Sequence, residues 1–550
     1  MAMQLPSMRR PTFRRLAHAA LGPLFKSRLW WLTLPRRAGT PLIFPSIDLW
    51  PGDAGRGAVI IGGDFQCAGK TIREADAPWL AAGVSKGWIA TVSAFDWLRD
   101  LRAAGGDAAR ERGRTLIRRW IETHGTGWRD IAWRPDILGT RIANWIEYGA
   151  LLTGGADAEF LEMLTVSLRK QATHLQRTAS FAAPGAPRIR ALKGLIFAAL
   201  AFGGGKALLK PLRALELQIG HDVLSDGGHL SRSPAVQLSV LRDLIDIRAA
   251  LRDSQQEVPE SIQTSIDRMA PMLRFFRHGD GGLALFNGSD EDEGWLIDVT
   301  LTRSEARGKP LESAPHTAFE RLTANRTLVL MDVGAPPPPG YDAEAHAGPL
   351  SFEMSTGKER LVVNCGAHRG DSADWQTAQR TTAAHSTITI EDQNAAEILP
   401  GAGIGARPHA LPVERREAEG NIWIEAGHDG YKRSVGIEHQ RRIYLSANGG
   451  DLRGEDTLTG GGSRKYVTRF HLHPSVQASM VQEGSSVLLR LTSGEGWRFR
   501  ASGGVISLQE SVYLGIRDVV KRTEQIVVSA ATQNGNGQIK WAFSRLAKDA

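Results

Sequence analysis

Hydrophobic periodicity changes near residue 310, and this change constrains the fold more than any other feature of the chain. Between about residues 75 and 277, apolar side chains recur every three or four positions, which is typical of helices that bury one face. Beyond about residue 310 they alternate with polar side chains in short runs separated by turn residues, which is typical of strands. This order predicts an all-helical domain followed by an all-β domain.

The helical region divides into periodic runs joined by short, often glycine-rich links. Links this short make successive helices antiparallel neighbours, and Pro234 and Pro259 stand where a first helical turn accepts proline. The runs expected to form helices are 137–152, 158–177, 188–202, 206–224, 233–253 and 259–277.

The second region contains many short alternating runs, which favour a large antiparallel sandwich. The runs expected to form strands are 327–334, 360–366, 386–392, 421–427, 441–446, 466–474, 486–494, 497–501 and 524–531. We therefore predict three parts: a basic N-terminal arm and irregular lead-in (1–74), a helical domain (75–310) and a β-sandwich (311–550).

Composition narrows the classes of partner. The 550 residues carry a net charge of +8, much of it from arginine, which suits planar carboxylate, sulfate or phosphate groups. The chain has no zinc-knuckle spacing, no RNP-like aromatic motif and no Lys/Arg-rich tail, so we predict no nucleic-acid partner. Its two cysteines, Cys67 and Cys365, form no CxxC motif, which excludes a disulfide framework and a cysteine-based zinc site.

The N-terminus is basic and contains Trp30 and Trp31. Its apolar run from Leu16 to Phe25 is short and is interrupted by His18, so it does not predict a cleavable signal peptide. Two interpretations remain: a solvated arm, which we favour, and peripheral contact with an anionic membrane surface. No apolar stretch is long enough to predict a transmembrane helix.

Several short motifs, in order, resemble the heparinase II/III family of polysaccharide lyases. In the helical region they are "RIANWI" (141–146), "KGLIFAALAF" (193–202) and "SDGGHLSRSP" (225–234). In the β region they are "LSFEMS" (350–355), "AAHSTITIED" (383–392), "HDGYKR" (428–433) and "RFHLHP" (469–474). The resemblance spans nearly the whole chain and implies an incomplete (α/α) toroid followed by an antiparallel β-sandwich.

The resemblance also implies a function. Lyases of this family cut uronic-acid polysaccharides, glycosaminoglycans among them, by β-elimination and need no organic cofactor. The partner implied is an acidic polysaccharide, and the location implied is the cell envelope or periplasm. The cytoplasm stays the alternative, because the N-terminus does not predict a cleavable signal.

β-Elimination needs three kinds of group. The uronate carboxylate must be neutralised by hydrogen bonds or positive charge, a base must remove the adjacent proton, and an acid must protonate the leaving oxygen. The family's Asn-His motif falls at Ala186 and Pro187 here, and its Tyr-His motif falls at Val236 and Gln237. The expected neutralising pair and the expected acid/base tyrosine are therefore absent.

Three residues are the candidates for catalysis in a remodelled site. His385 in "AAHST" matches the family's active-site histidine; its structural alternative is a buried histidine bonded to backbone. Tyr431 in "HDGYKR" is the candidate acid/base, with a sandwich-core tyrosine as the alternative. His229 lies in the glycine-rich turn that leads into the helix beginning near Ser233. Its structural alternative is that this turn is an ordinary helix start.

Other polar residues are candidates for binding substrate. Arg188 and Arg190 follow the lost Asn-His position, and Arg232 follows His229; each could hold a carboxylate or sulfate, or could belong to a solvated or structural face. Asn144 and Tyr148 lie one helical turn apart, and they either line a cleft or tie helices together.

A metal site is a further candidate. Some family members hold zinc in the sandwich, and here His471, His473 and Asp392 are the possible ligands. The two histidines alternate on an expected strand and point to opposite faces, so the ligand set is incomplete and we predict no required cofactor, with structural zinc as a possibility.

Three functions remain open. The first, which we favour from the sequence, is a polysaccharide lyase with a remodelled site. The second is a binding protein that keeps the fold and has lost the chemistry. The third is a different processing activity on a cell-envelope polysaccharide. Fold alone does not choose between them.

Overall fold

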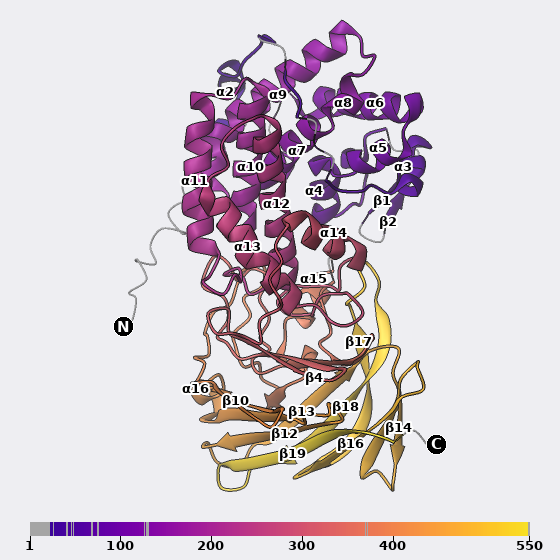
Figure 1. Ribbon diagram of the computed structural model, residues 1–550, viewed down its shortest axis with the longest axis vertical. Coiled ribbons are helices and arrows are strands. Elements are labelled where there is room, and N and C mark those ends of the chain that lie inside the picture. The colour runs from indigo at the N-terminus through magenta and orange to yellow at the C-terminus, as the bar shows by residue number, and fades with distance from the viewer. Residues whose placement is uncertain are drawn as a thin grey trace. The chain divides into compact units, whose positions relative to one another are not determined.

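The structure is a computed structural model that describes residues 23–25, 27–39, 42–45, 47, 49–67, 70–73, 76–125, 127, 131–368, 370 and 372–547. The chain forms two compact units. The helical unit comprises residues 1–222 and 242–265, and the sheet unit comprises residues 223–241 and 266–550. Figure 1 labels the elements of both units.

The helical unit is built almost entirely of helices. Its elements are α2 (Arg28–Leu32), α3 (Ala54–Ile61), β1 (Phe65–Cys67), β2 (Lys70–Ile72), the 3₁₀ turn η1 (Pro78–Leu80), α4 (Lys86–Ala94), α5 (Leu98–Ala104), α6 (Gly106–His124), α7 (Pro135–Glu147), α8 (Gly149–Thr153), α9 (Ala158–Thr178), η2 (Ala179–Phe181), α10 (Ala186–Ala201) and α11 (Lys206–Asp222). Helices α12 (Pro234–Asp253) and α13 (Glu260–Phe275) contribute residues to both units.

Helices α7 and α10 approach each other closely because glycines face glycines. A Cβ added to Gly194 would lie 2.4 Å from the Cα of Gly139, and one added to Gly139 would lie 2.3 Å from the carbonyl oxygen of Arg190. No side chain fits at such a contact, so the two backbones pack directly on each other. This crossing places the C-terminal end of α7 beside α10, where the charged side chains described below gather.

Besides its parts of α12 and α13, the sheet unit contains α14 (Gly294–Ser304) and a series of strands. These are β3 (Ser313–Ala314), β4 (Phe319–Ala324), β5 (Thr327–Asp332), β6 (Phe352–Thr356), β7 (Glu359–Val363), β8 (Ile388–Ile390), β9 (Glu414–Ala418), β10 (Asn421–His428), β11 (Glu438–Leu445), β12 (Asp451–Thr459), β13 (Lys465–Leu472), β14 (Gln477–Val481), β15 (Ser486–Arg490), β16 (Gly496–Ser502), β17 (Val505–Tyr513), β18 (Lys521–Ala531) and β19 (Asn536–Arg545). Short helices α15 (Ala373–Ala378) and α16 (Lys432–Val435) and the turn η3 (Thr382–Ala384) lie between strands.

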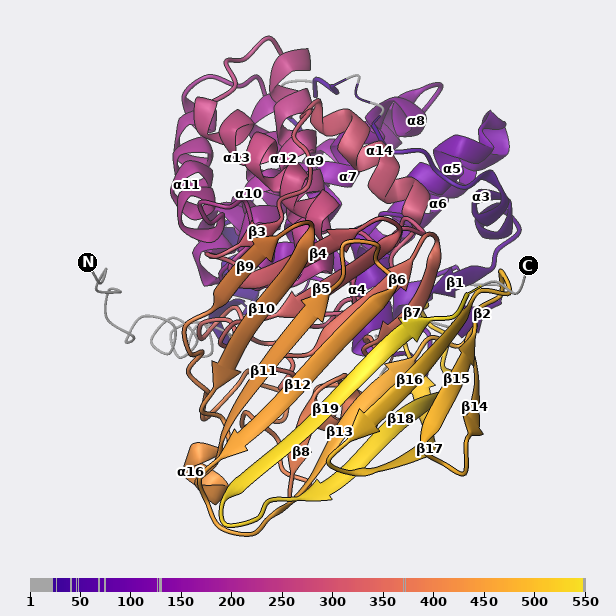
Figure 2. The same ribbon diagram turned by 60° about the horizontal axis from the view of Figure 1, so that its bottom comes forward.

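The strands form two large antiparallel sheets. One has the order β14-β15-β16-β19-β12-β11-β10-β9, and the other has the order β17-β18-β13-β7-β6-β5-β4-β3, with β8 paired to β13. Figure 2 shows the first sheet in front, with its strands side by side. Inward side chains of both sheets share one hydrophobic core; the ring of Phe352 on β6, for example, stacks on Trp541 of β19 at 5.3 Å. The unit is therefore a β-sandwich.

The predicted order of helices before strands is confirmed, and the element bounds agree within a few residues for most runs. The expected helix 137–152 divides at Tyr148 into α7 and α8. The expected runs do not include strands β3, β4, β6, β9, β12, β14, β17 and β19. In β12, Gly454 and Asp456 occupy two of the inward positions, which conceals the alternation.

The compact units divide the chain differently from the predicted boundaries at residues 75 and 311, because residues 223–241 and 266–310 belong with the sheets.

Within the predicted lead-in, the described residues include α2 and α3. Trp30 donates its indole N–H to Nδ1 of His174 at 3.1 Å, and Trp31 stacks on the same ring. Both rings thus pack in the helical unit, contrary to a free arm. Residues 1–22 lie outside the described residues.

No helix among the described residues is long and apolar enough to cross a membrane.

Replacing Gly194 with alanine should destabilise the helical unit. The added methyl group must push α7 away from α10, and overpacking of this kind costs about 1–3 kcal/mol. Gly220→Ala in α11 is the matched control, because nothing lies within 4 Å of its added Cβ and the change should stabilise the helix slightly. Urea unfolding followed by circular dichroism measures both; equal midpoints for the two variants would contradict the close crossing.

Candidate functional site

The predicted site residues fall in both units. His229, Arg232, His385, Tyr431 and the candidate metal ligands belong to the sheet unit, whereas the other candidate binding residues belong to the helical unit. Each group is described within its own unit.

His385 lies in a chain of hydrogen bonds that uses every ring nitrogen of two histidines. The Gly288 N–H donates to Nε2 of His346 at 3.0 Å, so Nδ1 of His346 carries the proton and donates to Nε2 of His385 at 2.9 Å. Nδ1 of His385 then donates to the carbonyl oxygen of Thr381 at 2.8 Å. The hydrogen-bond pattern assigns a neutral tautomer to each ring.

Burial favours these neutral rings. His385 is 2% exposed, and burial lowers its pKa to about 4. Burial and the neighbouring His385 lower the pKa of His346 well below its usual value. Neither imidazole therefore offers a lone pair to a substrate, and the arrangement matches the structural alternative given for His385 above.

Tyr431 lies in the core of the sandwich. It is fully buried, and its hydroxyl donates to the carbonyl oxygen of Ile388 at 2.7 Å. Burial raises the pKa of the phenol above its usual value. The predicted acid/base role does not agree with this position, because a donor bonded to backbone and sealed from solvent cannot reach a glycosidic oxygen.

Gln237 clamps the glycine-rich turn that contains His229. Its amide N–H groups donate to the carbonyl oxygens of Gly227 and Met269 at 2.8 and 3.0 Å, and its carbonyl oxygen accepts the His229 N–H at 2.9 Å. His229 is 2% exposed, and its Nδ1 accepts the Ser231 N–H at 3.1 Å. Gln237, at a position that the resemblance predicts to be catalytic, therefore hydrogen-bonds local backbone groups instead.

Arg232 also makes structural bonds instead of facing solvent. Its Nε donates to the carbonyl oxygen of Thr317 at 2.8 Å and its Nη1 to that of Ala335 at 2.7 Å. Its Nη2 donates to the carbonyl oxygen of Ala318 at 2.9 Å and pairs with the Asp332 carboxylate. With these donors engaged and 7% of the residue exposed, Arg232 cannot also grip a substrate carboxylate, contrary to the prediction.

Asn144, Arg188 and Arg190 connect elements of the helical unit. The Asn144 amide donates to the carbonyl oxygen of Ala94 at 2.9 Å, which is the helix-tying alternative. Arg188 donates to backbone carbonyls of η2 and the residue after it. Arg190 lies 3.7 Å from the carboxylate of Asp243, with 35% of its side chain exposed.

A buried charge cluster, formed by Glu147, Lys193, Asp243 and Asp246, was not predicted from the sequence. Nζ of Lys193 lies 3.0 Å from Asp243 and also pairs with Asp246. The indole N–H of Trp50 donates to Asp246 as well. All four members of the cluster are at most 8% exposed, so the lysine neutralises acids that burial would otherwise make very costly.

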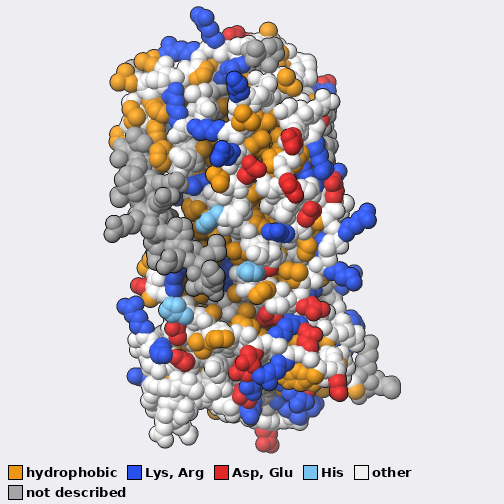
Figure 3. All heavy atoms as spheres, turned by 60° about the vertical axis from the view of Figure 1, so that its left-hand side comes forward, with side chains coloured by type: hydrophobic (Ala, Val, Ile, Leu, Met, Phe, Trp, Pro, Cys, Tyr) orange, Lys and Arg blue, Asp and Glu red, His pale blue; other side chains and the backbone are white. Residues whose placement is uncertain are grey.

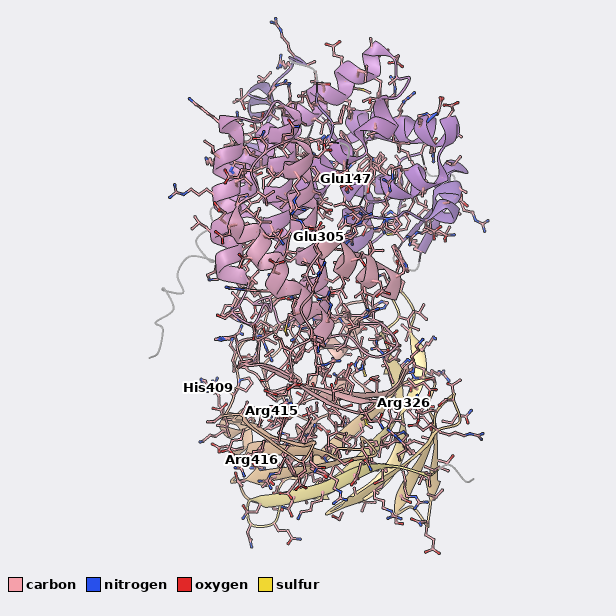
Figure 4. The ribbon with its side chains drawn as sticks, viewed as in Figure 1. Glu147, Glu305, Arg326, His409, Arg415 and Arg416 are labelled. Atoms are coloured by element: carbon pink, nitrogen blue, oxygen red, sulfur yellow. The ribbon has the colours of Figure 1, made fainter. Side chains whose placement is uncertain are left out.

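Glu147 is the member of the charge cluster whose pKa is raised to a value near neutral pH. Figure 4 labels it at the end of α7. Burial, reinforced by the charge of Asp246, raises its pKa to about 8. Burial and the adjacent Glu147 also raise the pKa of Tyr148 well above its usual value, so the predicted binder Tyr148 lies beside a carboxyl that can hold a proton near neutral pH.

The candidate metal ligands are not brought together. Nδ1 of His471 lies 2.8 Å from the Ser511 hydroxyl, and its Nε2 lies 3.0 Å from the Ala383 carbonyl oxygen. His473 pairs with Ser475, and Asp392 is exposed. Across the residues that the structure describes, no group of three His, Cys, Asp or Glu side chains could hold a metal ion.

Comparison with known proteins places the chain in a family. The family model described as heparinase II/III-like, C-terminal, matches residues 306–542. The FtsZ-localized protein C of Caulobacter vibrioides (strain NA1000 / CB15N) is 32% identical over 539 residues, which cover 94% of this chain and 92% of that protein. The chain therefore belongs to the heparinase II/III family.

Solved structures show the fold. A heparinase III structure is 12% identical, with a TM-score of 0.75 over 99% of this chain and 93% of that chain. The heparan sulfate lyase HepC from Pedobacter heparinus is 16% identical, with a TM-score of 0.60 over 99% of this chain and 92% of that one. The predicted class, an (α/α) toroid followed by an antiparallel β-sandwich, is confirmed.

Replacing Glu147 with glutamine should change how stability depends on pH. The folded pKa of about 8 lies above the usual 4.5, so unfolding releases a proton between these values and the wild type loses stability as pH rises through them. The variant lacks this loss, and its free energy of unfolding relative to the wild type should rise by roughly 3–5 kcal/mol across that window.

Chemical denaturation at a series of pH values measures this difference. Glu111→Gln on α6 is the control, because that side chain is exposed, and its difference from the wild type should stay nearly flat. A flat difference for Glu147→Gln would contradict the raised pKa.

Proposed function

We propose that this protein uses the lyase fold to bind an acidic polysaccharide and does not cleave it by β-elimination. The observation that carries the proposal is the hydrogen-bond chain through His346 and His385, which engages all four ring nitrogens. A base in β-elimination must present a free lone pair to the proton beside the uronate carboxylate. His385 has none to present unless the chain breaks.

The other required groups support the same conclusion. Ala186 and Pro187 cannot neutralise a carboxylate, and Gln237 is committed to backbone groups. The Tyr431 hydroxyl is bonded inside the sandwich core. Loss of neutraliser, base and acid together is what a binding protein tolerates and a lyase of this mechanism does not.

The acidic character of the polysaccharide rests on charge. The chain has 67 Lys and Arg against 59 Asp and Glu. On the face that Figure 3 shows, blue and red side chains are intermingled and form no continuous basic stripe. Such a surface suits separate contacts between arginines and the carboxylates or sulfates of a polymer, and is less suited to a nucleic-acid backbone.

A second candidate function rests on Glu147. A carboxyl with a pKa of about 8 can give or take a proton near neutral pH, as a general acid or base does. This candidate requires a polysaccharide to reach Glu147, of which only 7% is exposed; the protein would then be an enzyme with a relocated acid/base and not a binding protein.

The cellular location that we propose is taken from the Caulobacter relative described above. That protein is called FtsZ-localized, and the identity extends over 94% of this chain. We propose that this protein is cell-associated and collects where FtsZ assembles. A fluorescent fusion imaged together with labelled FtsZ tests this; coincident bands are expected, and a uniform distribution in cells with FtsZ bands would contradict it.

Absorbance of unsaturated uronates tests the proposed function. Incubation of the purified protein with alginate, heparin, heparan sulfate, hyaluronan and bacterial capsular polymers should produce no rise, because β-elimination lacks its base. Binding to at least one of these polymers, measured by calorimetry, should be retained. A rise that persists in His385→Ala but disappears in Glu147→Gln would favour the second candidate.

The variant His385→Ala serves as the matched control for chemistry. It removes one link of the buried chain and leaves the donor of His346 without its acceptor, so it should lower stability by roughly 1–3 kcal/mol without changing absorbance. A rise in the wild type that His385→Ala abolishes, while the variant remains folded, would overturn the proposal and restore the lyase.

A further inference from the structure

The outer face of the eight-stranded sheet contains a hollow that no predicted site residue touches. It has a volume of about 650 Å³. Its lining comes from strands β10, β11, β12, β16 and β19 and includes, among others, Trp423, Arg442, Tyr444, Arg453, Arg500 and Lys540. Figure 2 shows these strands side by side, with their outer face toward the viewer.

Strand register places the key side chains in one transverse row. Trp423 pairs with Tyr444, and Tyr444 pairs with Arg453. Ala542 lies between Arg453 and Arg500 as the partner of both. Paired residues project from the same face, so neighbouring strands about 4.8 Å apart present aromatic, aromatic, cationic, small and cationic side chains in succession.

The hollow has an excess of positive charge. Four of its lining side chains are cationic, namely Arg442, Arg453, Arg500 and Lys540, and only Glu455 is anionic. Arg442, Arg453 and Lys540 pair with Glu425, Asp451 and Glu455 but stay 53%, 67% and 59% exposed, and such exposed pairs are weak. Within the described part of the chain Arg500 has no ion-pair partner, so an anionic ligand would complete the arrangement.

Two aromatic rings adjoin these cations. The ring centroids of Trp423 and Tyr444 lie 5.1 Å apart at 45°, and the Tyr444 hydroxyl is held by Asn421 at 2.8 Å. The guanidinium of Arg453 lies 5.8 Å from the centre of the Tyr444 ring. The apolar face of a sugar ring can be buried against aromatic rings while its carboxylate meets a planar guanidinium.

We propose that this hollow, together with the row across β10, β11, β12, β19 and β16, binds uronate-containing segments of an acidic polysaccharide. Trp423 and Tyr444 support a sugar ring, and Arg453 and Arg500 hold carboxylate or sulfate groups on either side of Ala542. The inference rests on the proposed function for the identity of the polymer. It adds a site on the sandwich whose lining includes none of the predicted site residues.

An acidic peptide fits this face less well. Extended peptides gain affinity by adding a strand to a free sheet edge, whereas β11, β12 and β19 are paired on both sides. Their backbone groups are therefore already used, and recognition must come from side chains. The combination of aromatic surface and separated arginines favours a ring-shaped, anionic ligand.

Calorimetry with the full-length protein and oligogalacturonate or alginate oligomers tests the site. The double variant Arg453→Gln/Arg500→Gln should weaken binding by at least about tenfold, because it removes two charge-assisted contacts. The control Arg326→Gln/Arg522→Gln changes net charge equally on two exposed residues, one in the turn between β4 and β5 and one on β18, and should change affinity less than about twofold. Trp423→Leu should weaken binding, and Trp423→Phe should largely preserve it.

The outcomes separate this proposal from the proposed function. If the wild type binds none of the oligomers or the polymers named above, the proposed function fails and this site fails with it. If the wild type binds and Arg453→Gln/Arg500→Gln binds equally well, the site is overturned while the proposed function stands. If poly-glutamate competes as well as the oligouronate, the hollow recognises negative charge without recognising a sugar ring, and the assignment to a glycan is overturned.

Discussion

The buried pair of Arg441 and Asp456 is the interaction on which the sandwich depends. Both side chains are fully buried, with Nε of Arg441 2.7 Å from the carboxylate. Nη1 of Arg441 donates to the carbonyl oxygens of Leu350 and Ser386 at 2.8 Å. Although burial alone raises a carboxyl pKa, Arg441 and His439 hold the pKa of Asp456 below its usual value. Removing either partner would leave an uncompensated buried charge.

This pair also holds the backbone next to His385. Because Arg441 fixes the backbone at Ser386, the ring of His385 is held beside His346, and a Cβ on Gly348 would lie 2.6 Å from it. A ring packed this tightly is well suited to structure and poorly suited to proton transfer with a ligand. The family fold is thus retained, while the histidine that the sequence resemblance singles out for chemistry belongs to a saturated interior.

The sequence predicts the architecture well and the site less well, for a physical reason. Helix and strand periodicity is local, so α9, α10 and β10 agree closely with expectation, whereas β12 is hidden by its inward Gly454 and Asp456. Whether a polar side chain is free depends on partners far along the chain. His346 lies 39 residues from His385, and no local pattern connects them.

The same reasoning explains the features that sequence motifs miss. The charge cluster joins Glu147 of α7 to Lys193 of α10 and Asp246 of α12. The signal that could have found it is Lys193, an ionisable residue directly before the apolar run 194–202 of the expected helix. The hollow on the outer face of the eight-stranded sheet is lined by residues from five strands. Its row of aromatic and cationic side chains can be recognised only once the strand register is known.

Histidine-selective ¹⁵N NMR of His385 tests the central claim most directly, since the claim is that this ring is neutral, internally bonded and out of reach of a ligand. The account predicts a neutral ring with its proton on Nδ1 at all pH values above its pKa of about 4, unchanged when a polyuronate is added. Titration near neutral pH, or a change of tautomer on addition of the polymer, would contradict the account and would identify His385 as a participant in catalysis.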